Sequence, residues 1–316
     1  MVVIDVTPYC GASFIKNIEQ LAIEIYRNRK QQICLSLEYE GFDITHNGLE
    51  NAVKNIADIA GIPYNQISFL TNDRLAKSNI FKCEYIGWSE IFRAVKRDIT
   101  AGKYPIQNKI YFPKQKTYCQ LLGRADNNRM FGHYRHTTYE HKDKGLVTFH
   151  HDFRKYNDTT VEYLDFVLLY NKEYKQMLVD LPYSDVGEYI QPPIIFGNQR
   201  DTEFWNTLYK NISIELVYET VTTSKTFYLT EKTIRPMQYG KLFMIAAGKY
   251  YEKYLEEMGF DIFSDIIDKS YDKEESYTRI DMMYDSLTEF LTSNFDCNSL
   301  TERLQYNQKL VMDLAE

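Results

Sequence analysis

Short apolar segments alternate with amphipathic segments along this chain, and this alternation constrains the fold more than any other feature. Apolar runs of strand length occupy residues 2–6, 33–37 and 66–71. Residues 13–29 and 48–60, which lie between them, carry apolar side chains at helical spacing. Such a β-α-β-α-β order is typical of a parallel sheet with helices on both faces. The sequence therefore predicts an α/β fold.

The alternation stops between residues 100 and 116 and then resumes. This stretch holds glycine, two prolines and several lysines without helical periodicity, so we interpret it as a linker with a domain boundary near Pro113. Further strands are expected at 117–122, 146–150, 212–219 and 242–245. Helices are expected after the first of these strands, at 201–210, at 231–238 and at 276–315, the last of them interrupted near residues 294–298. We therefore predict an N-terminal α/β domain at 1–113, a C-terminal α/β domain at 114–275 and a helical region at 276–316.

Composition narrows the class of protein. The chain has 316 residues, of which 44% are hydrophobic and 26% charged, as in globular proteins. Its formal net charge of −7 gives no overall attraction to polyanions, so nucleic-acid binding would need a local basic patch. Five cysteines without a CxxC pair favour the reducing cytoplasm. We expect no membrane span, because no apolar run approaches the required length of about 18 residues, and no signal peptide.

The segment at residues 212–245 predicts a binding site for an anion. It reads ISIELVYETVTTSKTFYLTEKTIRPMQYGKLFMI, which we interpret as a strand, a polar loop, a helix and a second strand. Glu219 ends the first strand, and ligands of open α/β sheets bind outside such strand ends. Thr230 is a good N-cap, so Glu231 and Lys232 would occupy the first helical turn.

Two chemical roles follow for this segment. The free N–H groups and the dipole of the helix start favour a diphosphate, to which Lys232 adds a positive charge. Glu219 and Glu231 could accept hydrogen bonds from the hydroxyls of a ribose. The alternative is purely structural, since acidic residues in a first turn also complement the dipole and Lys232 could be a solvated surface charge. Pro236 would kink or shorten the helix.

Two blocks of this sequence resemble the α1,3-fucosyltransferases, in glycosyltransferase family 10. The donor-binding signature of that family reads approximately FENS…DYITEKLWRALxxGxVPVxxGxxxYE. Its first block corresponds here to residues 218–220 (YET). Its second block corresponds to residues 227–232 (FYLTEK), which include Tyr228 and Thr230. Upstream, the run RMFGHYR from Arg129 is similar to the helix whose leading arginine contacts the donor diphosphate in that family. Thr220 stands where the family has asparagine, which leaves the donor sugar open.

The resemblance implies a fold, a reaction and a setting. The fold is the GT-B type, with two Rossmann-like domains that face each other across a cleft and the donor on the C-terminal one. The reaction moves a sugar from a nucleotide-sugar donor, a GDP- or UDP-sugar, to an acceptor hydroxyl. The chain, including the run GFDIFSDIIDKSYD at residues 259–272, also resembles predicted glycosyltransferases of phages and environmental viruses. This likeness favours the cytoplasm of a bacterium or of a phage-infected host cell.

An inverting transfer needs a carboxylate that accepts the proton of the acceptor, and in the fucosyltransferases this base comes from the N-terminal domain. Glu38 and Glu40 follow the strand at 33–37, and we choose Glu40, beside Gly41, over Glu38. The alternative is a pair of carboxylates on a surface loop.

No metal is expected at this site. Five of the six histidines fall between residues 133 and 151, yet no cysteine or carboxylate recurs near them at ligand spacing. No DxD motif follows a strand, and the acidic run at residues 261, 265, 268 and 272 is expected to be a solvated helix face. Arg129, Lys232 and the helix start would supply the positive charge instead.

The acceptor has two candidates. A glycan fits the fucosyltransferase likeness, whereas the viral likeness favours the hydroxymethyl group of a modified pyrimidine in phage DNA. A DNA acceptor would need base flipping and a basic groove. A function of another class also stays open, namely a nucleotide-binding module without transferase activity.

Overall fold

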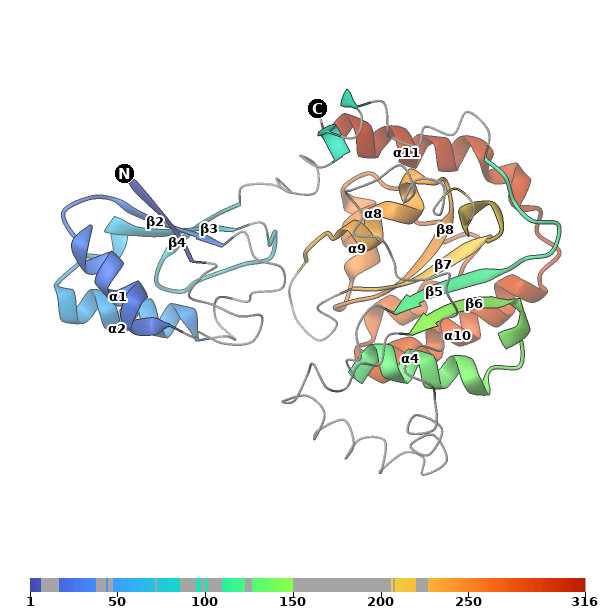
Figure 1. Ribbon diagram of the computed structural model, residues 1–316, viewed down its shortest axis with the longest axis horizontal. Helices are drawn as coiled ribbons and strands as arrows, with labels where there is room; N and C mark the ends of the chain where they lie inside the picture. Colours follow the sequence, from blue (N-terminus) through green and yellow to red (C-terminus); the bar gives the residue numbers. More distant parts are fainter. Residues whose placement is uncertain are drawn as a thin grey trace. The chain divides into compact units, whose positions relative to one another are not determined.

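The structure is a computed structural model that describes residues 1–6, 17–37, 44, 48–71, 73–85, 95–97, 100–101, 110–122, 127–149, 206, 208–219 and 227–315. It confirms the predicted α/β class, with two parallel four-stranded sheets. Each sheet lies in its own compact unit (Figure 1). The first unit comprises Met1–Arg93 and Ser224–Thr230, and the second comprises Ala94–Thr223 and Glu231–Glu316. The GT-B arrangement and the division at residue 113 stay predictions.

The strands of the first unit follow one another across the sheet without a reversal. Its order is β1 (Val2–Asp5), β2 (Ile33–Leu37), β3 (Ile67–Thr71) and β4 (Lys82–Tyr85), and a short 3-10 turn (Tyr64–Gln66) leads into β3. Right-handed crossovers between strands in such an order place successive helices on the same face. The helices α1 (Ile18–Arg27) and α2 (Leu49–Ala60) do share one face and contact each other (Figure 1). For these two helices, the prediction of coverage on both faces is wrong.

The two faces of the first sheet differ in chemistry. Ile4, Leu35 and Phe69 lie in register and belong to one buried apolar cluster that also takes in residues of both helices. The opposite face carries small polar side chains, among them Ser36 and Ser68. The core of this unit therefore lies between the sheet and the two helices.

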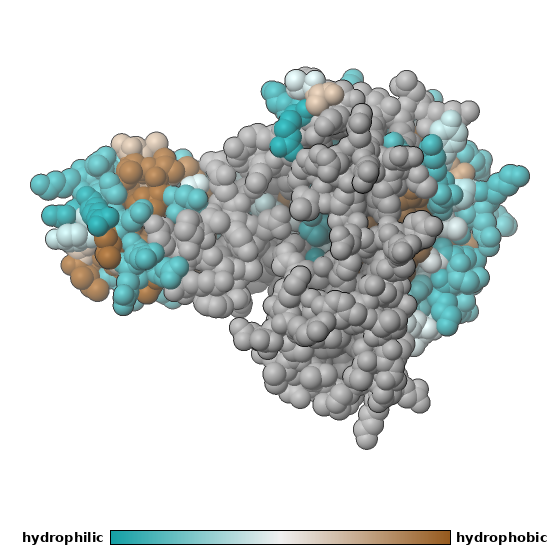
Figure 2. Space-filling model, viewed as in Figure 1, coloured by the Kyte–Doolittle hydropathy of each residue, from teal (hydrophilic) through white to brown (hydrophobic). Residues whose placement is uncertain are grey.

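Not every apolar side chain on these helices marks that core. Figure 2 shows brown hydrophobic residues among teal hydrophilic ones on the visible face of the first unit. Ile59 of α2 is 89% exposed, and Ile18, Ile23 and Tyr26 of α1 are exposed as well. Single exposed apolar side chains of this kind are ordinary on a protein surface.

The strand order of the second unit reverses. Its order is β6 (Gly145–Phe149), β5 (Tyr118–Leu122), β7 (Ile214–Tyr218) and β8 (Leu242–Ala246), so the chain leaves β5 in one direction and then crosses to its other side. The helices are α4 (Asn127–Thr138), α8 (Glu231–Gln238), α9 (Tyr251–Glu257), α10 (Ser276–Thr292) and α11 (Thr301–Ala315). Short 3-10 turns occupy Lys142–Lys144, Ser270–Lys273 and Cys297–Leu300.

The helices of the second unit cover both faces of its sheet. α4 packs against α10 on one face, and α8 packs against α11 on the other (Figure 1). The side chains of β5 alternate accordingly. Gln120 accepts a hydrogen bond of 2.7 Å from Tyr284 of α10, whereas Cys119 lies in an apolar cluster with Tyr239, which follows α8. The reversal at β5 is compatible with a Rossmann-like sheet.

Candidate functional site

The reversal of strand order places the candidate site at the carboxyl ends of β5 and β7. In open α/β sheets, neighbouring connections diverge to opposite faces at such a point and leave room for a ligand. Glu219 directly follows β7 and is only 3% exposed. Residues 123–126 and 220–226, which follow these two strands, lie outside the described residues. The prediction that Glu219 ends a buried strand is confirmed.

Arg129 lies at this same edge of the sheet. It belongs to the first turn of α4, is 3% exposed, and donates from Nη2 to the carbonyl oxygens of Tyr218 (3.1 Å) and Glu219 (3.3 Å). Gly132 allows the helix to approach so closely, because a Cβ atom there would lie 2.5 Å from Cζ of Tyr218. The helix that follows β5 is therefore fastened to the carboxyl end of β7.

The Glu219 carboxylate is held by two hydroxyl groups. Oε1 accepts hydrogen bonds from Thr233 of α8 and, at 3.3 Å, from Tyr251 of α9. Thr233 and Tyr251 also lie 3.2 Å apart, oxygen to oxygen, and both are buried. Sequence reasoning made Glu219 a hydroxyl acceptor for ribose. The structure shows that Oε1 of this carboxylate accepts protein hydroxyls, and the ribose role stays a prediction.

The helix α8 begins at Glu231 and ends at Gln238, at the predicted residues. Pro236 lies inside it. The helix stops because Gly240 adopts φ +60, and the N–H groups of Gly240 and Lys241 donate to the carbonyls of Met237 (3.1 Å) and Pro236 (2.9 Å). Those bonds form the Schellman motif.

Glu231 and Lys232 occupy the first turn of α8 and form an ion pair of 2.6 Å, with side chains 21% and 22% exposed. Burial acts to raise the pKa of Glu231, but the neighbouring Lys232 ammonium outweighs it and keeps that pKa below its usual range. The Glu231 carboxylate is thus charged at neutral pH, and both side chains are partly accessible. A phosphate oxygen could replace the carboxylate as partner of the Lys232 ammonium.

Tyr228 and Thr230 precede this turn and are buried. They belong to the segment Ser224–Thr230 that packs in the first unit. In that unit the Phe227 N–H donates to Asp73 Oδ1 (3.0 Å), and the Arg74 N–H donates to the Phe227 carbonyl (3.4 Å). The chain therefore passes from β7 to the first unit and back before α8 begins.

The predicted catalytic bases, Glu38 and Glu40, lie outside the described residues, so their roles stay predictions. His150 and His151, to which no role was assigned, lie outside the described residues as well.

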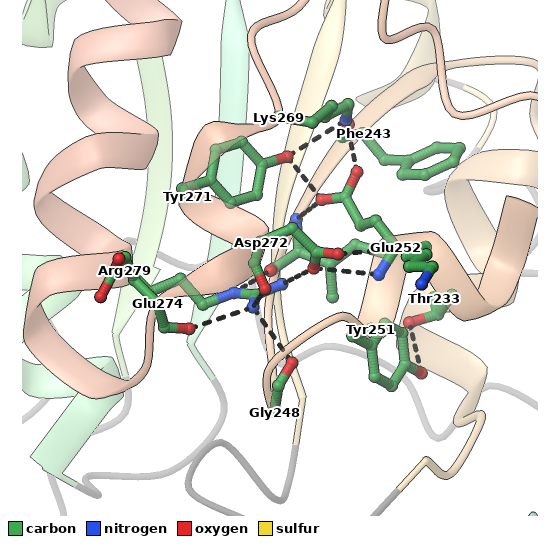
Figure 3. Close-up of polar contacts among 12 residues, drawn as sticks. Thr233, Phe243, Gly248, Tyr251, Glu252, Lys269, Tyr271, Asp272, Glu274 and Arg279 are labelled. Atoms are coloured by element: carbon green, nitrogen blue, oxygen red, sulfur yellow. Dashed lines mark hydrogen bonds and ion pairs between the residues drawn. The ribbon is translucent and has the colours of Figure 1, made fainter. Parts of the chain in front are cut away.

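Sequence reasoning missed a buried charged network that surrounds the exit from β8 (Figure 3). The Asp272 carboxylate accepts the N–H groups of Glu252 (3.0 Å) and Lys253 (3.1 Å), which open α9, and pairs with Arg279 at 2.6 Å. Arg279 is fully buried and also donates to the carbonyls of Ile245 (2.8 Å) and Gly248 (3.0 Å). This arginine thus fixes the loop after β8.

A second pair in the same network joins Glu252 to Lys269 at 2.5 Å. Glu252 also accepts the Ile245 N–H at 2.8 Å, and Lys269 donates to the Phe243 carbonyl at 2.9 Å. Burial lowers the pKa of Lys269, and Glu252 opposes this shift without reversing it. The sequence held a signal for Glu252. This residue lies in the run KYYEKY, next to the position where the fucosyltransferase signature has YE.

The prediction that the acidic run at 261–272 forms a solvated helix face is wrong. Asp272 is 6% exposed and belongs to the buried network. Asp261 and Asp265 instead hold Arg303 of α11, at 2.5 and 2.8 Å. Acidic residues at helical spacing can therefore occur in a segment that is not helical.

A third buried ion pair lies between β7 and α8. Arg235 pairs with Glu215 at 2.5 Å and donates from Nε to the Tyr209 hydroxyl at 2.8 Å, and Tyr209 donates to Glu215. Burial acts to lower the pKa of Arg235, but Glu215 outweighs it and raises that pKa. This pair locks α8 to the strand that ends at Glu219.

The part of the chain that the structure describes contains no group of three or more histidine, cysteine or acidic side chains that could hold a metal ion. His136, one of the clustered histidines, contacts the Tyr118 hydroxyl at 2.8 Å through Nδ1. Within these residues, no helix has the length and apolarity needed to cross a membrane.

Comparisons of this chain with models of protein families, with curated proteins and with solved structures found no match.

Proposed function

We propose that this protein is a glycosyltransferase that moves a sugar from a nucleotide-sugar donor to an acceptor hydroxyl. The observation that carries the proposal is the sequence Thr230-Glu231-Lys232 at the start of α8, on the connection that leaves β7 beside the reversal of strand order. The same three residues stand in the donor signature that the chain resembles. Sequence likeness and sheet topology thus favour the same edge of the second unit.

The donor diphosphate would bind to positive charge and to N–H groups. Lys232 is an accessible ammonium in the first turn of α8, where the helix dipole also favours an anion. Arg129 contacts the end of β7 and carries the charge that the resemblance assigns to the diphosphate. Fixed positive charges of this kind stabilise the nucleoside diphosphate as it departs. In the proposed reaction these charges stabilise the departing diphosphate, and no metal ion takes part.

The proposed step inverts the anomeric carbon. The acceptor oxygen forms a bond to that carbon while the bond to the diphosphate oxygen breaks, and a carboxylate takes the acceptor proton. Our candidate for this base is Glu40, with Glu38 second, on the first of two domains in a GT-B arrangement. The ribose hydroxyls would be held by Glu231, whose side chain is more accessible than that of Glu219.

A thermal-shift panel of GDP-, UDP- and ADP-sugars tests the donor site. A ligand at one hundred times its Kd stabilises the native state by about 2.7 kcal/mol, which corresponds to a rise of about 5 °C in Tm. We expect such a rise with one nucleotide class. The absence of a shift with every nucleotide at millimolar concentration would contradict the proposal.

Matched lysine variants assign the effect to α8. Lys232→Met should abolish the shift and the turnover, because it removes the proposed partner of the diphosphate. Lys82→Met, on β4 of the first unit, should leave both unchanged, since Lys82 pairs there with Glu84 at 2.5 Å. Equal loss in the two variants would indicate a general charge effect instead of a site.

The acceptor is proposed to be a glycan, with the hydroxymethyl group of a modified DNA pyrimidine as the alternative. The net charge of −7 favours the glycan, because it opposes binding to DNA. A gel shift on hydroxymethylated duplex DNA separates the two, since a DNA acceptor requires binding at low salt that weakens as salt rises. Nucleotide binding without transfer to either acceptor would instead support a non-catalytic binding module.

A further inference from the structure

Glu219 and the first turn of α8 are joined by a cluster of hydroxyl groups. Thr233 stands two residues after Glu231, and its hydroxyl donates to the Glu219 carboxylate. The Tyr251 hydroxyl, from a different helix, donates to the same carboxylate oxygen at 3.3 Å. The carboxylate therefore connects the end of β7, the start of α8 and the start of α9.

Tyr251 is itself fixed in place by the buried network. Its own helix begins where Asp272 accepts the N–H groups of Glu252 and Lys253, and Arg279 holds Asp272 at 2.6 Å (Figure 3). Figure 3 shows the hydroxyls of Thr233 and Tyr251 turned toward each other, beside this network. Because Asp272, Arg279 and Tyr251 are each less than a tenth exposed, the Tyr251 hydroxyl has little freedom to move.

We propose that Thr233 and Tyr251 are positioning residues that hold the Glu219 carboxylate as an anchor for the first turn of α8. This inference rests on the proposed function, in which Glu231 and Lys232 on that turn bind the donor. Two hydroxyl groups that donate to one carboxylate oxygen fix the direction in which that carboxylate points. The anchor keeps the turn at the carboxyl end of β7, and Glu219 acts through the turn instead of touching the donor.

The groups that surround Glu219 come from α4, α8 and α9. Arg129 on α4 donates to the backbone carbonyl of Glu219, Thr233 and Tyr251 face its carboxylate from α8 and α9, and Lys232 and Glu231 share the first turn of α8. Loss of the Tyr251 hydroxyl would leave the carboxylate with one donor fewer and with more freedom to turn away from α8.

The test compares Tyr251→Phe with Tyr250→Phe in the full chain. The first variant removes only the hydroxyl that contacts Glu219, and the second removes a hydroxyl from the preceding tyrosine, which is 43% exposed. Binding of GDP and UDP is measured by calorimetry at neutral pH, together with KM, kcat and Tm. Thr233→Val removes the other hydroxyl and is measured in the same way.

We expect Tyr251→Phe to weaken nucleotide binding about tenfold, since a hydrogen bond to a charged group is lost. The donor KM should rise more than kcat falls. Tyr250→Phe should match the native protein in every measurement.

Three results would overturn the inference. Native protein that binds no nucleotide removes the proposed function and this inference with it. Native protein that binds, with Tyr251→Phe and Thr233→Val unchanged in affinity and in donor KM, removes the inference alone. Failure of both variants to fold would assign the hydroxyls to stability instead of positioning.

Discussion

The two units hold their helices by different means. In the first unit, α1 and α2 pack on the sheet through one apolar cluster, and its buried carboxylates accept backbone N–H groups, as Glu50 does from Asn79 at 2.8 Å. In the second unit, the described residues form three buried ion pairs, which join Glu215 to Arg235, Glu252 to Lys269 and Asp272 to Arg279. These pairs fasten α8, α9 and α10 around β7 and β8.

Stability alone does not explain this difference. A buried ion pair loses hydration that its attraction only partly restores, so apolar residues of similar volume often serve stability as well or better. Our hypothesis is that the second unit uses its buried charges to fix positions around the edge where Arg129, Glu219 and the start of α8 meet. In the described residues of the first unit no such edge has to be held in position, and apolar packing holds the helices of this unit. The variants below test this comparison.

The largest effect is expected for Arg279→Ala. It leaves the buried Asp272 carboxylate without its cation and the Ile245 and Gly248 carbonyls without a donor, which should cost about 4 kcal/mol of unfolding free energy. Urea denaturation gives this loss, and hydrogen exchange should show it in residues of the second unit. Arg303→Ala is the control, because its ion pairs with Asp261 and Asp265 are partly exposed and should contribute about 1 kcal/mol or less. Equal losses would contradict the assigned role of burial.

Leu35→Ala tests the apolar side of the comparison. Leu35 is fully buried at the centre of the first sheet, so the variant should lose about 3 kcal/mol through lost burial and a cavity. Hydrogen exchange should rise in β1, β2 and β3, while the amides of β7 and β8 keep their protection. The comparison between separate units fails if both sheets lose protection together.

Gly132→Ala should have a smaller effect, at the candidate site. The new Cβ atom would meet the Tyr218 ring at 2.5 Å, and the strain should exceed the gain in helix propensity and leave a net loss of about 2 kcal/mol. A double variant with Tyr218→Leu should recover most of this loss, because it removes the ring. Thermal unfolding gives the stability of the single and double variants. If the losses of the two single variants simply add in the double variant, α4 does not depend on this contact.

Most strands and helices could be predicted because hydrophobic periodicity is a local signal. The helix α8 was predicted to its last residue from Thr230 and Gly240, and β2 from the run ICLSL. The strand β4, Lys82–Tyr85, was missed because half of its residues are charged and none is buried. The seven-residue helix α9 was missed as well, since its start is fixed by Asp272 from a distant part of the chain.

The candidate site could be predicted only in part. Local sequence indicated the strand end at Glu219 and the helix start at Glu231. The inward orientation of the Glu219 carboxylate depends on Tyr251, 32 residues away, and the buried pairs join residues whose charges looked solvated in sequence. Partners of this kind are set by tertiary packing, which periodicity does not encode.

The smallest expected effect concerns pH and His136. Burial lowers the pKa of His136 to about 4, and the nearby Lys142 adds to the shift. The unfolded chain therefore binds a proton near pH 6.5 while the folded chain does not, so the stability should fall as pH drops from 6.5 to 4 and change no further below that. The full shift corresponds to about 3 kcal/mol, and solvent at a half-buried ring reduces it to about 1 kcal/mol. His136→Asn keeps an acceptor for the Tyr118 hydroxyl but cannot titrate, so urea denaturation at pH 7 and pH 4.5 should show a smaller pH dependence than in the native protein. An unchanged pH dependence would mean that other groups of the second unit cause the loss.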